Sequence, residues 1–116
     1  MKRLLITGFA PFGGDGVNPA LQAVQALPDT VGPWQLCKRE MPVAFRGAPE
    51  ALYAAMDEVE PDAVLMIGLA ASRGMVTPER QGVNEKDARI PDNGGISPKT
   101  SPWSPAGRRS SIPRCP

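Results

Sequence analysis

The alternation of apolar and polar positions divides residues 1–70 into short apolar runs and amphipathic segments. Three runs predict β-strands because each is short and is bounded by charged residues, glycine or proline; they lie at 2–8, 34–43 and 62–68. Two segments predict helices because their apolar side chains recur at helical spacing; they lie at about 19–27 and 46–59. This order of elements is typical of an α/β fold, a wound and mostly parallel sheet with helices on both faces.

The third apolar run, Ala63–Ile67, contains no polar residue. Strands of this kind are usually central in a parallel sheet and covered on both faces, which is what we expect here. Ligands of wound sheets bind beyond the carboxyl ends of the strands. The sequence therefore predicts that the loops after Gly8 and Gly68 lie beside each other.

The loop at 8–16 is rich in glycine and leads into a helix that Asn18 and Pro19 are expected to begin. A glycine-rich loop in this place can cradle phosphate, but the Lys-Ser/Thr pair and the dinucleotide spacing are both absent. Phe9 and Phe12 stand three residues apart among small neighbours. They predict either a small apolar pocket or two side chains that fill the core beneath the loop.

The stretch Thr77–Asn93 combines carboxylates, arginines, asparagines and two prolines with little that is apolar. Buried polar groups cost free energy unless they are paired, so this stretch is not expected to form a core. Its composition favours a solvated loop with a charged hairpin, and the wall of a binding site is the other interpretation.

Composition narrows the chemistry further. The chain has 116 residues, a net charge of +1, two cysteines and no histidine. One domain is expected, with no nucleic acid or membrane partner, no metal and no cofactor. No secretion signal or membrane span is recognisable, so a cytoplasmic protein is predicted. Without histidine the chain holds no Cys–His or Ser–His pair, and Cys37, inside a predicted strand, is expected to act as a small hydrophobe.

Four motifs stand in order along the chain: G-F-A-P-F-G-G at 8–14, N-P-A at 18–20, T-P-E-R at 77–80 and D-A-R-I-P-D-N at 87–93. In this order and at this spacing they resemble the motifs of pyroglutamyl peptidase I, a family of cytosolic cysteine peptidases. The resemblance covers residues 1 to about 98. The chain departs from the family pattern at Ala10, Ala20, Leu69, Ala71 and Ser72, where the family usually has Glu, Ser, a polar residue, Gly and Gly.

The resemblance implies a hydrolase that removes an N-terminal pyroglutamyl residue from a peptide with a Cys–His–Glu triad and without a cofactor. Glu79 would orient the histidine, Arg89 would lie near the oxyanion, and Phe9 and Phe12 would hold the lactam ring. Family members form homo-oligomers.

The family's nucleophilic cysteine and its histidine lie in a second half of the fold, and neither Cys37 nor Cys115 takes the nucleophile's position. The chain is therefore expected to be an incomplete α/β/α sandwich that is inactive alone. Two alternatives stay open: a module that binds a lactam or phosphate, and a non-catalytic fragment prone to aggregate at an unpaired sheet edge.

The composition changes after Lys99, which predicts a boundary between a family-like part at 1–99 and an irregular tail at 100–116. The tail is either disordered or out of frame. If residues 100–109 are encoded by GC-rich codons, one base added in front of those codons shifts the reading frame. The shifted frame encodes D-E-P-V-V-A-G-G-P-A, which resembles the family's sequence after the P-D-N motif. A frameshift predicts that the downstream DNA encodes the missing Cys and His.

Overall fold

The structure is a computed structural model that describes residues 1–12, 16–70, 72–80, 82–83, 86, 88, 90–99, 101–102 and 110–111. The chain forms two compact units, Met1–Ala70 and Ala71–Pro116. Within the described residues, neither helix has the length and hydropathy that a bilayer span requires.

The first unit is built around strand β1 (Lys2–Phe9). Strands β3 (Trp34–Met41) and β4 (Ala63–Ile67) run parallel to β1 on its two sides, and the short β2 (Thr30–Val31) pairs antiparallel with β3. The sheet order is β2-β3-β1-β4. This arrangement confirms the prediction of a wound, mostly parallel α/β sheet.

The register brings the carboxyl ends of the parallel strands to one edge of the sheet. Phe9 pairs with Met41 of β3, and Gly8 pairs with Ile67 of β4. The segments that follow β1 and β4 therefore start side by side, as the sequence predicted.

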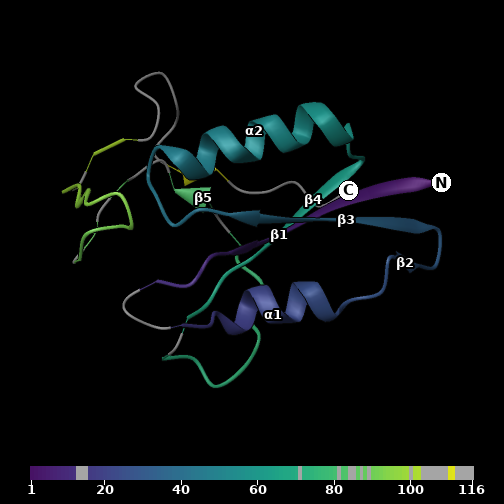
Figure 1. The fold of residues 1–116 in the computed structure, drawn as a ribbon, viewed down its shortest axis with the longest axis horizontal. Helices are drawn as coiled ribbons and strands as arrows, with labels where there is room; N and C mark the ends of the chain where they lie inside the picture. Colours follow the sequence, from purple (N-terminus) through teal and green to yellow (C-terminus); the bar gives the residue numbers. More distant parts are fainter. Residues whose placement is uncertain are drawn as a thin grey trace. The chain divides into compact units, whose positions relative to one another are not determined.

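The two helices cover opposite faces of this sheet (Figure 1): α1 (Pro19–Ala26) lies on one face and α2 (Gly47–Val59) on the other. The core under α2 is a cluster of buried side chains, Leu5, Met41, Ala55 and Val59. Under α1, Ala20 and Val24 are buried. Alternate residues of β1 serve the two faces, so Leu5 and Ile6 are both almost fully buried.

Helix α1 approaches the sheet closely at Gly8. A Cβ atom added to Gly8 would lie 2.9 Å from the Cα atom of Leu21, which is closer than carbon atoms pack. Glycine is required at this position because a side chain has no space, and not because of its backbone conformation, since the φ of Gly8 is not positive. This close approach fixes α1 against the end of β1, next to the loop that carries Phe12.

In the first unit, the observed elements agree with the predicted ones except at their ends and at one short strand. Strand β3 stops at Met41 rather than Val43, because Pro42 has no amide hydrogen to donate to the sheet. Strand β2 was not predicted, since two residues are too few to show an alternating pattern.

The prediction that Ala63–Ile67 is covered on both faces is wrong for the described structure. Strand β4 is the last strand of the sheet, and its Leu65 and Met66 side chains are 48% and 63% exposed. The sequence has the apolar character of a central strand, whereas the described sheet places it at an edge.

The second unit contains strands β5 (Gly82–Val83) and β6 (Ser110–Ser111), which pair antiparallel. A single antiparallel bridge joins Lys86 to Ser101. Strand β6 lies in the segment expected to be an irregular tail. Most of that segment lies outside the described residues, so the predicted boundary at 99 stays a prediction.

Candidate active site

The loop after β1 is held by its backbone on one side and by a buried asparagine on the other. The Ala10 amide donates to the Met41 carbonyl at 2.9 Å, and the Asn18 Nδ2 donates to the Ala10 carbonyl at 3.4 Å. The Asn18 Oδ1 accepts from the Ala20 amide at 2.9 Å, which is the predicted N-cap bond of α1. Asn18 is 3% exposed, so a single buried side chain ties the loop to the start of the helix.

The two phenylalanines of this loop have different surroundings. Phe9 is half-buried and packs against the core cluster beneath α2, so it fills the core as one of the two interpretations predicted. Phe12 is also half-buried, at the point where the described part of the loop ends. That Phe9 and Phe12 line a ligand pocket stays a prediction, because residues 13–15 lie outside the described residues.

Glu79 lies in the second unit and is held by an arginine of the same unit. The Arg73 Nη1 donates to the Glu79 Oε1 at 2.8 Å and to the Thr77 Oγ1 at 2.7 Å. One guanidinium therefore fixes both ends of the short segment Thr77–Glu79. The side chains of Arg73 and Glu79 are 48% and 71% exposed, which leaves the carboxylate accessible from solvent.

The residues around the predicted Arg89 form a hairpin-like loop. The Ala88 amide donates to the Pro98 carbonyl at 2.8 Å, and the loop turns at Asp92. The Asp92 Oδ1 accepts from the amides of Gly94 and Ile96 at 2.9 and 2.8 Å. Asp92 is therefore the side chain that closes this turn, and the charged hairpin that the composition of Thr77–Asn93 favours stays a prediction, because part of that stretch lies outside the described residues.

Arg89 itself lies outside the described residues, as does Asp87 of the same motif. The Phe9 and Phe12 loop belongs to the first unit and Glu79 to the second, so the structure describes each by itself. That these side chains form one site stays a prediction.

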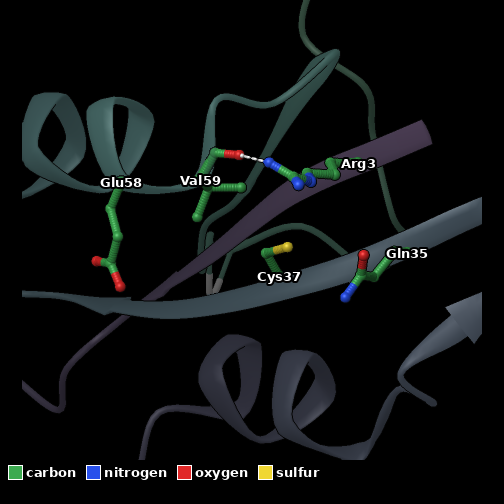
Figure 2. Close-up of a pocket in the computed structure, with 5 residues that line it drawn as sticks. All are labelled: Arg3, Gln35, Cys37, Glu58 and Val59. Atoms are coloured by element: carbon green, nitrogen blue, oxygen red, sulfur yellow. Dashed lines mark hydrogen bonds between the residues drawn. The ribbon is translucent and has the colours of Figure 1, made fainter. Parts of the chain in front are cut away.

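Cys37 lies at a different place, in an open hollow under the last turn of α2 (Figure 2). Figure 2 shows Arg3 reaching the carbonyl of Val59, to which its Nη1 donates at 2.8 Å. The hollow is about 270 Å³, below the usual range for ligand pockets, and Arg3 and Gln35 come from the amino ends of their strands. Cys37 also packs against the core cluster, as expected of a small hydrophobe, so the hollow carries no catalytic assignment.

Two contacts in this geometry were not predicted from the sequence. The first is the pairing of Arg73 with Glu79, for which opposite charges six residues apart around Pro78 were a usable signal. Asn18 was predicted to cap α1, but its second bond, to the Ala10 carbonyl, depends on the path of the loop.

Comparison with known proteins identifies the source of these motifs. A family model described as pyroglutamyl peptidase matches residues 2–116. The chain belongs to the pyroglutamyl peptidase family. Its relatives include the pyrrolidone-carboxylate peptidase of Staphylococcus saprophyticus, 50% identical over 96 residues that cover 83% of this chain and 45% of the relative. The peptidase of Thermococcus onnurineus is 44% identical over 86% of this chain and 50% of its own length.

Solved structures agree with the sequence relatives. The pyroglutamyl peptidase I of Bacillus amyloliquefaciens superposes with a TM-score of 0.93 at 37% identity, over 97% of this chain and 55% of its own. The pyrrolidone carboxyl peptidase of Thermococcus litoralis gives 0.92 at 36% identity, over 97% and 51%. The chain thus spans about half the length of the family members that it matches, and it has the fold of that half.

Proposed function

We propose that this chain supplies the amino-terminal half of a cysteine peptidase that removes N-terminal pyroglutamyl residues from peptides. The observation that carries the proposal is the family match over residues 2–116, which includes the phenylalanine loop and the T-P-E-R motif. A cytoplasmic location and assembly into homo-oligomers are part of the same proposal.

In the proposed reaction, a cysteine thiolate attacks the carbonyl carbon of the pyroglutamyl amide bond, and a histidine gives a proton to the leaving amine. Water then hydrolyses the thioester and frees pyroglutamate. The histidine has to come from outside these 116 residues, since they contain none. The cysteine is likewise assigned to the other half, because Cys37 packs against the core under α2 and the resemblance gives neither Cys37 nor Cys115 the nucleophile's position.

Four side chains of this chain are given roles. Glu79 holds the imidazole in one tautomer and stabilises the imidazolium, and its own orientation is supported by the bond from Arg73. Arg89 stabilises the negative charge that develops on the attacked carbonyl oxygen. Phe9 and Phe12 hold the flat, uncharged lactam ring, which suits an apolar slot with few hydrogen bonds.

A pyroglutamyl amide that releases a coloured amine tests the proposal in two proteins. The first is the chain alone, for which no turnover is expected. The second is a chimera in which residues 1–99 are followed by the part of the Staphylococcus saprophyticus relative that lies beyond the 96 matched residues. Turnover is expected from the chimera, and Glu79→Gln should lower its kcat by about 100-fold or more while leaving KM nearly unchanged.

The matched control is Glu58→Gln, an exposed carboxylate on α2 that pairs with Arg39 and belongs to no family motif considered above. This control should leave turnover within about twofold. Turnover by the chain alone that disappears in Cys37→Ala would overturn the assignment of the nucleophile to the other half. A folded chimera that is indifferent to Glu79→Gln would overturn the role of Glu79.

A further inference from the structure

The segment from Arg73 to Glu79 is a short loop that one side chain closes. The Arg73 Nη1 donates to the Thr77 Oγ1 at 2.7 Å and to the Glu79 Oε1 at 2.8 Å. Met75 and Val76 lie between the ends that this guanidinium joins, in a stretch that is neither helix nor strand. The two bonds of Arg73 therefore restrict the path of the loop on both sides of these residues.

The two side chains at the tip of this loop are apolar and exposed. Met75 is 76% exposed, and Val76, at 95%, is the most exposed large hydrophobic side chain in the part of the chain that the structure describes. Isolated apolar side chains are common on protein surfaces. This pair differs in its place, because it lies three and four residues before Glu79 in the segment that Arg73 holds.

The proposed reaction relates this place to one side of the substrate. Phe9 and Phe12 hold the lactam ring, whereas the leaving amine takes its proton from the histidine that Glu79 orients. Groups beside Glu79 are therefore on the leaving-group side of the scissile bond. Val76 is at most about 10 Å along the chain from Glu79, a distance that a histidine side chain and one substrate residue together bridge.

We propose that Met75 and Val76 form a subsite for the residue that follows pyroglutamate, and that this subsite favours a large apolar side chain such as that of leucine. The inference rests on the proposed function and extends it from the lactam ring to the leaving peptide. The tip carries no charged side chain, so apolar contact is the interaction that it offers. A contact that removes about 50 Å² of apolar surface from water strengthens binding roughly tenfold.

Titration of the full 116-residue chain with two neutral peptides, pyroglutamyl-leucinamide and pyroglutamyl-glycinamide, tests this contact directly. NMR of the protein labelled at its methionine methyl groups follows the resonance of Met75. The leucine peptide is expected to shift this resonance and to bind at least threefold more tightly than the glycine peptide. Met66, which is 63% exposed on β4, is the internal control, and its methyl resonance should not shift.

The chimera that carries residues 1–99 supplies a kinetic readout. Its kcat/KM for the leucine peptide should exceed that for the glycine peptide by about tenfold. Met75→Gln combined with Val76→Thr nearly keeps the size of both side chains and makes them polar, so it should bring the two kcat/KM values within about twofold of each other. Val31→Thr is the matched control, since Val31 is 50% exposed on β2, and it should leave the tenfold difference unchanged.

Each remaining outcome also decides the matter. An unshifted Met75 resonance, equal binding of the two peptides, or equal kcat/KM values overturns the inference, and the proposed function stands wherever the chimera hydrolyses both peptides. A double variant whose urea midpoint falls by more than about 0.5 M overturns it too, because the tip then packs against the other half of the chimera. A chimera that hydrolyses neither peptide counts against the proposed function, and the titration of the full chain then decides the inference.

Discussion

Gly8→Ala is a sharp test of how this fold positions its candidate site, because a single methyl group is placed against a backbone atom. The added Cβ would lie 2.9 Å from the Cα of Leu21 and 3.3 Å from both its amide nitrogen and its Cδ1. The side-chain atom can rotate away, but the two backbone atoms move only if α1 shifts as a body. That shift would loosen the helix that begins at Asn18 and anchors the phenylalanine loop.

The expected cost follows from two opposing effects. Overpacking a core position costs about 1–3 kcal/mol, and the backbone contact places this site toward the upper end. Replacing glycine by alanine also lowers the entropy of the unfolded chain, which returns about 0.4–1 kcal/mol. The net expected loss is about 1–2 kcal/mol of the free energy of unfolding.

Urea unfolding followed by far-UV circular dichroism measures this loss. With a slope of about 1–2 kcal/mol per molar for a domain of this size, the midpoint should fall by roughly 1 M. Gly68→Ala is the matched control: Gly68 follows β4 as Gly8 nears the end of β1, and among the described residues no atom beyond its chain neighbours lies within 4 Å of its added Cβ. A Gly8→Ala midpoint equal to that of Gly68→Ala would refute the packing argument.

Three further changes test the local geometry of the two units. Asn18→Ala removes a buried cap and the bond to the loop, so the free energy of unfolding should fall by about 1–2 kcal/mol in the same urea assay. The control Gln22→Ala, at an exposed position of α1, should change the free energy of unfolding by less than about 0.5 kcal/mol. Asp92→Ala removes two bonds to turn amides, so exchange of the Ile96 amide should accelerate about tenfold or more. Arg73→Ala should leave the urea midpoint unchanged, since the pair is exposed, yet lower kcat of the chimera about tenfold, with partial recovery in Arg73→Lys. An equal loss of kcat in Arg73→Lys and Arg73→Ala would contradict a role based on charge.

The fold of the first unit could be predicted from the sequence because its signals are local. Three apolar runs and two helical patterns lie in an order that has few topological solutions, and Asn18-Pro19 marks a helix start by its own chemistry. Strand ends were less predictable, since β3 stops where Pro42 interrupts the ladder. The close approach at Gly8 was not predictable, because it depends on where α1 crosses the sheet.

The candidate site was predicted mainly through the family motifs. Periodicity alone could not separate an apolar pocket from core packing at Phe9, and the structure shows that Phe9 does pack against the core. The Arg73–Glu79 pair depends on the path of the chain through Pro78, which the amino-acid sequence alone does not determine. The roles of Arg89 and Phe12, and the meeting of the two units at one site, stay predictions.

The position of β4 at the edge of the sheet is the most informative difference between what the sequence predicts and what the structure shows. Its residues carry the pattern of a strand covered on both faces, whereas the described sheet leaves Leu65 and Met66 exposed at its edge. The chain also spans only about half the length of the relatives that it matches. An apolar strand at an edge and the absence of histidine from these 116 residues are both what the proposed role as one half of a peptidase predicts.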